Sequence, residues 1–279
     1  MRGIAFALIS VLACGPNANH TGPGDDDDGS GGDANNGSNG SNGGGYTVYA
    51  HSDTVLYSID LANQTLVTVG PFNSPNHESM TDLAVGTDGT IYVISESFIY
   101  TASAANGQLT ELGPMNACGM QTVALTTTST GQIWAGDFKG ALCQIDVTAS
   151  PPTIAAPIMM GSGMALTGDF VGVSDGTIFG TAYKLTDQSG SGTQANNVLV
   201  KIDLTSGAVT PVGSTGFPEL YGVAFQEGKV FGFTHDGTGR VVTIDTTSGA
   251  GTLFGTFMDG SGKGIAFGGA GVNALVQIF

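Results

Sequence analysis

From Val198 to Gly213 the chain reads VLVKIDLTSGAVTPVG. Val198, Val200 and Ile202 occupy every second position, and the charged Lys201 lies between two of them. This period of two predicts a β-strand with one face buried. Small polar residues follow the run, as in a tight turn, and a second alternating run comes after them. The stretch therefore predicts a β-hairpin.

The hairpin recurs along the chain, and its copies begin at Val55, Phe98, Ala141 and Arg240. A second type of hairpin precedes most copies and begins at Met80, Ala165 and Tyr221. Together the two hairpins form a four-stranded unit that repeats about every 40–50 residues, which is the sequence pattern of an all-β propeller. One such sheet has two apolar faces that it cannot bury alone. Stacking the sheets around an axis buries both faces, and closing the ring removes the open edges.

The number of blades follows from the two ends of the repeat region. The first copy has strands near residues 46–50, 55–60 and 65–70 but lacks an inner strand. Gly264–Phe267 matches the inner strand Gly222–Phe225, so we expect a C-terminal strand to complete the N-terminal blade and close the ring. This count gives five blades. Residues 272–279 also resemble a strand, and this surplus leaves six blades as the alternative.

The N-terminus has the features of an export signal. Arg2 precedes an apolar run over residues 3–13, which is too short for a membrane span of about 20 residues. The run ends in VLACG, and this ending resembles the lipobox of bacterial lipoproteins. The resemblance implies a signal peptide over residues 1–13 and a lipid on Cys14. The alternative is ordinary cleavage nearby, with Cys14 incidental.

The composition changes over residues 14–45. Gly, Asn, Ser and Asp dominate this stretch, Asp25–Asp28 form an uninterrupted run, and large apolar residues are absent. Such a segment buries too little apolar area to offset the entropy of ordering, so we expect a disordered tether. The propeller domain should then span residues 46–279.

Charge limits the choice of partners. Of the 23 acidic residues five lie in the tether, and of the seven basic residues Arg2 lies in the signal, so the domain carries 18 acidic and six basic residues. This balance argues against nucleic acid, which needs a basic surface. It also argues against direct adhesion to anionic lipid, so the membrane would be reached only through the lipid anchor. We expect a monomer.

Cys118 and Cys143 are the remaining cysteines. An even pair in an exported domain favours a disulfide. The alternative is that Cys143 packs as a small apolar side chain.

The repeats resemble those of bacterial propellers of the NHL, SMP-30 and YncE-like groups. The residues that carry the resemblance are Thr87–Tyr92, Ser174–Phe179 and Lys201–Gly207. The resemblance covers most of the domain and implies the propeller architecture. It does not imply one activity, because these groups include enzymes, binding proteins and scaffolds.

Two sets of polar residues separate by their place in the repeat. The first is expected to hold turns. Asp60, Asp146, Asp203 and Asp245 each end a strand before a turn, and Asp88 and Asp175 lie in Asp-Gly turns. The second falls in loops that should gather on the opposite face of the ring: His51, His77, Glu78, Glu96, Asp137, His235 and Asp236. The carboxylates of this second set would suit calcium or magnesium, and the histidines would allow zinc. The alternative is that polar residues collect there because loops are exposed.

The sequence contains no recognisable catalytic motif: Gly-x-Ser-x-Gly before a helix, a phosphate-binding loop and His-Glu-x-x-His are all absent. This favours a lipid-anchored module that binds a protein or glycan at the bacterial cell envelope, as an outer-membrane lipoprotein. A calcium-type hydrolase or lactonase that uses the polar loop face is the first alternative. A passive structural or sensory module is the second.

Overall fold

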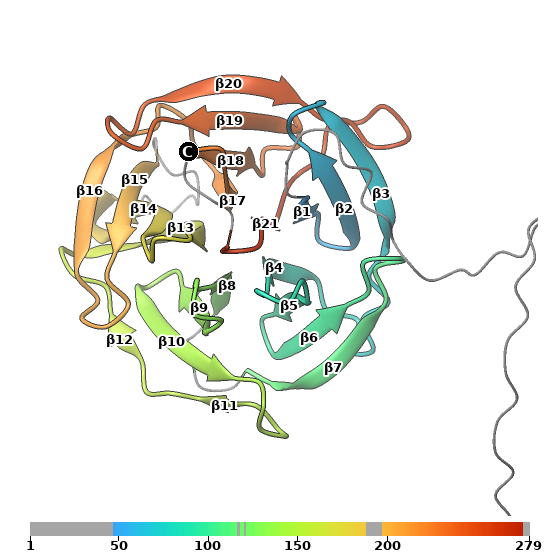
Figure 1. The fold of residues 1–279 in the computed structure, drawn as a ribbon, viewed down its shortest axis with the longest axis horizontal. Coiled ribbons are helices and arrows are strands. Elements are labelled where there is room, and N and C mark those ends of the chain that lie inside the picture. The colour runs from blue at the N-terminus through green and yellow to red at the C-terminus, as the bar shows by residue number, and fades with distance from the viewer. Residues whose placement is uncertain (1–46, 116–117, 120, 188–196, 276–279) are drawn as a thin grey trace, which may run out of the picture. The chain divides into compact units, whose positions relative to one another are not determined.

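The computed structural model describes residues 47–115, 118–119, 121–187 and 197–275. The predicted signal peptide, Cys14 and the predicted tether lie outside the described residues. Between Val48 and Gly271 five antiparallel sheets are arranged in a ring, so the domain is a five-bladed β-propeller (Figure 1). We number the blades 1 to 5 in chain order. Among the described residues no helix is long and apolar enough to cross a membrane.

The strands of each blade are given from the axis outward. Blade 1 contains β21 (Gly269–Gly271), β1 (Val48–His51), β2 (Val55–Asp60) and β3 (Thr65–Pro71). Blade 2 contains β4 (Met80–Val85), β5 (Ile91–Ser95), β6 (Phe98–Ala102) and β7 (Leu109–Pro114). Blade 3 contains β8 (Thr122–Thr127), β9 (Ile133–Asp137), β10 (Ala141–Asp146) and an outer position divided between β11 (Thr153–Ile154) and β12 (Ile158–Met159).

Blade 4 contains β13 (Met164–Gly172), β14 (Ile178–Lys184), β15 (Val198–Ile202) and β16 (Val209–Ser214). A short 3₁₀ helix, η1 (Leu185–Asp187), follows β14. Blade 5 contains β17 (Leu220–Gln226), β18 (Lys229–Thr234), β19 (Arg240–Ile244) and β20 (Gly251–Thr256).

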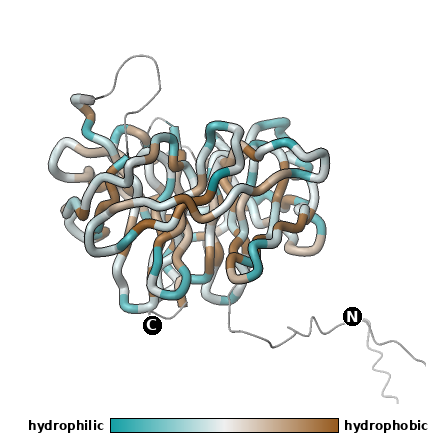
Figure 2. Tube along the Cα trace, turned by 90° about the horizontal axis from the view of Figure 1, so that it is seen from above, coloured by the Kyte–Doolittle hydropathy of each residue, from teal (hydrophilic) through white to brown (hydrophobic). Residues whose placement is uncertain are grey.

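The apolar core lies between the blades. In β15, Val200 belongs to a buried cluster that blade 4 shares with Leu142 of blade 3. The neighbouring Leu199 points to the other face and belongs to a cluster shared with Phe231 of blade 5. Each fully buried side chain of this kind contributes about 1.5–3 kcal/mol. A blade therefore needs a neighbour on both faces. The edge-on view shows hydrophobic strands between largely hydrophilic loops (Figure 2).

The ring is closed by the C-terminal strand, as predicted, but not by the predicted residues. Strand β21 pairs with β1, so that Gly271 faces Tyr49 and Gly269 faces His51. The assignment of the inner strand to Gly264–Phe267 is wrong. Gly264 instead forms an isolated bridge with Met258.

The physical reason is that the chain must cross from outer strand β20 to the axis before it can pair with β1. The residues that look like an inner strand make this crossing, and the Phe267 N–H donates to the Thr234 carbonyl (3.1 Å). The surplus strand expected at residues 272–279 is also absent from the described part, where Asn273 forms only a bridge to Val85. This removes the case for six blades. Residues 276–279 lie outside the described residues.

The aspartates that end the third strands hold the turns, as predicted. Asp60 accepts the Asn63 N–H (3.0 Å), and Asp203 accepts the Thr205 N–H (2.8 Å). Asp146 and Asp245, at the corresponding positions, make similar bonds. Asp88 and Asp175 lie instead in the turns between the first and second strands of blades 2 and 4, where they accept the N–H of Thr90 (2.9 Å) and of Thr177 (2.8 Å). These carboxylates are therefore engaged locally, on the face of the ring opposite the candidate site.

Cys118 and Cys143 are joined by a disulfide, with their Cα atoms 5.6 Å apart. Both side chains are buried. The bond joins Cys118, which precedes blade 3, to β10 within a core cluster shared by blades 2 and 3.

Candidate functional site

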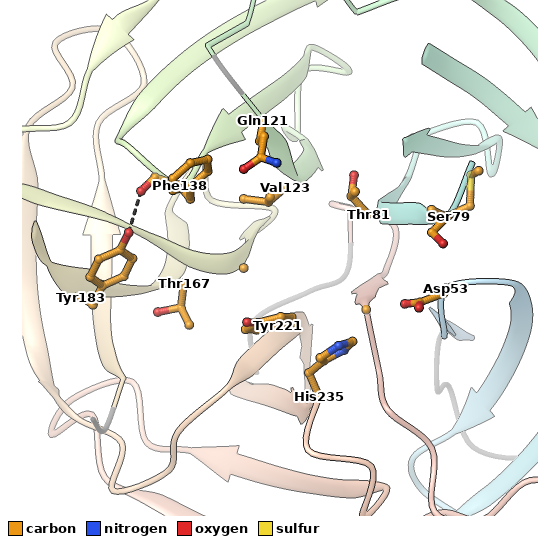
Figure 3. A pocket seen from close by; sticks show the side chains of 13 residues that line it. Asp53, Ser79, Thr81, Gln121, Val123, Phe138, Thr167, Tyr183, Tyr221 and His235 are labelled. Carbon is orange, nitrogen blue, oxygen red and sulfur yellow. Dashed lines mark hydrogen bonds between the residues drawn. The ribbon is translucent and has the colours of Figure 1, made fainter. Parts of the chain in front are cut away.

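A cavity of about 350 Å³ lies at the axis of the ring, on the face that carries the loops between blades (Figure 3). Every blade contributes to its lining: Asp53 and Gly268 beside blade 1, Ser79, Met80 and Thr81 of blade 2, Gln121, Val123 and Phe138 of blade 3, Thr167, Gly168 and Tyr183 of blade 4, and Tyr221 and His235 of blade 5. Concave sites of this size, with few polar groups among apolar walls, are typical of small-molecule binding.

A repeated irregularity of the inner strands builds this cavity. In blades 2, 3 and 5 the pairing of the first and second strands skips one residue, which is Thr81, Val123 or Tyr221. In blade 4 the skipped segment is longer and covers Thr167–Asp169. A β-bulge leaves its extra residue outside the ladder and re-aims that side chain. Four blades thus direct a bulge residue toward the same space.

One wall is aromatic. The rings of Tyr221 and His235 are stacked, with centroids 4.6 Å apart and planes inclined by 14°. His235 Nδ1 lies 3.0 Å from the Phe267 carbonyl oxygen, so this nitrogen carries a hydrogen that it donates. Burial raises the pKa of Tyr221, and the negative charge of Glu219 raises it further. The wall therefore lies in the negative field of Glu219.

The polar groups around the cavity differ in what they still offer a ligand. Thr81 donates its hydroxyl hydrogen to the Thr122 carbonyl (3.0 Å), and Gln121 donates an amide hydrogen to Glu96 (3.1 Å). The hydroxyl oxygen of Thr167 is buried and has no hydrogen-bond partner among the described residues. Such orphaned groups are costly in native proteins and mark places where a ligand or water is expected.

Two carboxyl groups lie directly beneath the cavity. Asp82 follows the bulge residue Thr81, and Asp169 ends the bulge of blade 4; both are fully buried. Asp82 accepts the N–H of Leu83 (2.8 Å) and of Leu125 in blade 3 (2.6 Å).

Asp169 serves three strands. It accepts the N–H of Phe170 (2.6 Å), of Val223 in blade 5 (2.7 Å) and of Ala270 in blade 1. A hydrogen bond between the two carboxyl groups joins Asp82 to Asp169. The pair therefore ties all five inner strands together at the axis.

One proton is shared within this pair. Burial raises the pKa of both carboxyl groups well above the usual value for aspartate, and the charge of Asp169 raises that of Asp82 further. The bond between them raises the pKa of Asp82 and lowers that of Asp169, so the pair as a unit keeps a proton that free aspartates would have lost. Beyond the pair, the space between residues such as Ala84, Phe170 and Ala270 is too small for a water molecule. The carboxyl pair is thus adjacent to the lining residues Thr81 and Gly168 but is fully buried and does not itself line the cavity.

The shared proton predicts how stability depends on pH. Because the folded pKa is raised, the native state holds a proton that the unfolded chain releases above about pH 4. The free energy of unfolding should therefore fall as the pH rises through the folded pKa, by up to about 1.4 kcal/mol per pH unit. Asp82→Asn keeps a donor toward Asp169 but cannot titrate. Urea unfolding from pH 4.5 to 8 should give a flatter slope for this variant; equal slopes would contradict the shared proton.

The structure brings one of the seven predicted site residues, His235, to the cavity. His51 is fully buried beside it; burial lowers the pKa of His51 to about 4, and its Nδ1 donates to the Ser52 carbonyl (2.8 Å). His77 lies exposed in the loop before blade 2, with φ of 57°.

The four predicted acids already have local partners. Glu78 accepts from the Ser95 hydroxyl, and Glu96 from Gln121. Asp137 is buried and accepts the N–H groups of Lys139 (2.9 Å) and Ala141 (2.7 Å). Burial opposes ionisation of Asp236, but bonds from Thr238, Arg240 and Thr234 outweigh it and lower its pKa to about 2. In the described part of the chain, no three His, Cys, Asp or Glu side chains gather as a metal site would require.

Sequence reasoning missed the bulge residues and the carboxyl pair. Thr81, Val123 and Tyr221 sit inside runs that read as ordinary strands. The available signal was Asp82 and Asp169, because each places a charged residue in an otherwise apolar inner strand. Such a residue is rarely buried without a specific set of partners.

Comparisons with known proteins agree on the fold. No family model and no curated protein matches the sequence. Among solved structures, a chain of a nidogen/laminin complex is 11% identical, with a TM-score of 0.53; the match covers 83% of this chain and 100% of that one. A putative TolB from Agrobacterium tumefaciens is 13% identical, with a TM-score of 0.48 and 79% of each chain covered. Virginiamycin B lyase from Staphylococcus aureus is 15% identical, with a TM-score of 0.40; the match covers 78% of this chain and 72% of that one. At 11% identity, the likeness to the nidogen/laminin chain shows the fold alone, and it agrees with the five sheets arranged in a ring: the chain is a β-propeller.

Proposed function

We propose that this protein is an exported, lipid-anchored binding module whose propeller captures a small ligand, or one group of a larger partner, in the axial cavity. The observation that carries the proposal is the cavity itself, because all five blades contribute to it. The buried, orphaned hydroxyl of Thr167 adds to the case, since a bound ligand would satisfy it. Presentation at the cell envelope is the role that the lipobox-like ending at Cys14 supports.

The geometry gives less support to a calcium-type hydrolase. That function needs several acids converging on one point with free oxygen atoms. Glu78 and Glu96 are bonded to Ser95 and Gln121, and Asp236 is paired with Arg240. The carboxyl pair beneath the cavity uses its oxygens on backbone N–H groups.

Filling the cavity tests the binding function. Val123→Phe adds a ring on a bulge side chain that lines the cavity, and fragments detected by ligand-observed NMR with the wild-type protein should no longer bind. Val67→Phe is the matched control, because Val67 is exposed on outer strand β3 and away from the cavity. Retention of all fragment binding by Val123→Phe would show that the cavity is not the binding site.

Anchoring is tested separately. Cys14→Ser removes the thiol that would carry the lipid, so the chain should no longer incorporate a labelled fatty acid and should move from the membrane fraction to the soluble fraction. Unchanged fractionation of this variant would refute the lipid anchor and would leave the cavity proposal untouched.

A further inference from the structure

The charges around the cavity limit the class of ligand that it can bind. Its lining contains one carboxylate, Asp53, and within the described residues it contains no lysine or arginine. Asp53 lies at the exposed β1–β2 hairpin, and its side chain points into the cavity (Figure 3). Glu219 adds negative charge beside Tyr221. Beside these two acids an anionic ligand would meet repulsion and a cation attraction. The nearby basic group, the Lys139 ammonium, lies on the blade 3 side, 5.6 Å from the centroid of the Phe138 ring.

The hydrogen-bonding groups that line the cavity also favour a cationic ligand with N–H donors. The donor hydrogens of several lining groups are already directed at protein acceptors: Thr81 to Thr122, Gln121 to Glu96, and His235 Nδ1 to Phe267. In an imidazole whose Nδ1 donates in this way, Nε2 is the ring atom that can accept a hydrogen bond. The Asp53 carboxylate and the orphaned Thr167 oxygen are further acceptors. A ligand that brings its own N–H donors matches this arrangement best.

The stacked rings of Tyr221 and His235 are the third feature of the cavity that favours a cation. An aromatic face attracts a cation placed over it, and its surface also accommodates an apolar body next to the charge. Phe138 extends the apolar lining on the blade 3 side.

We propose that the cavity binds a small organic ammonium ion, with its N–H groups toward Asp53 and its apolar body against the Tyr221–His235 stack. This inference rests on the proposed binding function and specifies its ligand class. A protonated amine supplies a positive charge for Asp53 and N–H donors for the acceptors named above. A neutral polyol would leave the negative charge of Asp53 without a positive partner. A quaternary ammonium would bring no N–H donors to the acceptors.

The test uses four ligands of similar shape with the full chain at pH 7: benzylammonium, benzyl alcohol, benzyltrimethylammonium and benzoate. Benzylammonium should bind at least about 10-fold more tightly than benzyl alcohol in titrations followed by NMR or calorimetry. Benzyltrimethylammonium should bind more weakly than benzylammonium, and benzoate should not bind.

Asp53→Asn should reduce benzylammonium affinity by about 10-fold and leave benzyl alcohol unchanged. Glu227→Gln is the matched control: it removes one negative charge from the exposed turn at the other end of β17 and should change neither affinity. Tyr221→Leu should weaken both ligands, because it removes the aromatic face.

The inference is overturned if the wild-type protein binds benzyl alcohol as tightly as benzylammonium, or if Asp53→Asn and Glu227→Gln behave alike. In either case, fragment binding that Val123→Phe abolishes would leave the proposed binding function standing. If neither the four ligands nor any fragment binds, both proposals fail.

Discussion

Replacing Asp169 by alanine is expected to lower the free energy of unfolding by about 4–5 kcal/mol, because it leaves three buried N–H groups without an acceptor. These groups belong to Phe170, Val223 and Ala270, so three inner strands lose their common partner. Asp82 loses its carboxyl partner at the same time. Urea unfolding followed by the fluorescence of Trp134, with the disulfide intact, measures the loss.

Two further variants test whether the loss of stability follows the number of buried N–H groups that lose their acceptor. Asp82→Ala removes the acceptor of two backbone N–H groups rather than three, so its loss of stability should be smaller. Asp175→Ala removes an exposed turn carboxylate that accepts the Thr177 N–H, and its loss should be a fraction of either. If Asp169→Ala cost no more than Asp175→Ala, the carboxyl pair would not be what joins the inner strands.

The architecture could be predicted from the sequence because strand alternation and a long repeat are both direct consequences of burial. The period of two in Val198–Ile202 follows from side chains pointing to opposite faces. The repetition follows from each four-stranded blade needing a neighbour on both faces. Ring closure was predictable in principle, because the first blade lacks one strand.

The closing residues could not be identified by similarity alone. Gly264–Phe267 has the composition of an inner strand but lies where the chain must still cross from β20 to the axis. Sequence similarity shows which strand a segment could pair with. It does not show how many residues the connection before that strand needs.

The candidate site was the least predictable part. Residues such as Glu78, Glu96 and Asp236 were selected because their type suits metal binding. Each of them instead forms a hydrogen bond or an ion pair with a nearby side chain. The residues that line the cavity lie at bulges, where the period of two is interrupted and the side chain changes direction. A pattern based on alternation cannot show where alternation fails.

Gly269→Ala should have the second large effect, because Gly269 lies where the two ends of the propeller join. A Cβ atom on this residue would overlap Asp82 Oδ1 and lie 2.7 Å from His51 Nε2. Neither neighbour can move freely: Asp82 is held by two N–H groups, and His51 is fully buried. We expect a loss of at least about 3 kcal/mol, at the upper end of the range for overpacked sites.

Gly260→Ala is the matched control, since a Cβ there meets no atom within 4 Å and the backbone is not in the left-handed region. Amide hydrogen exchange then separates two outcomes. If β21 closes the ring as one cooperative unit, Gly269→Ala should raise exchange in β1 and β4 together, because β21 packs against both. If exchange rose in β1 alone, β21 would only complete blade 1, and the carboxyl pair would be left to hold the remaining inner strands.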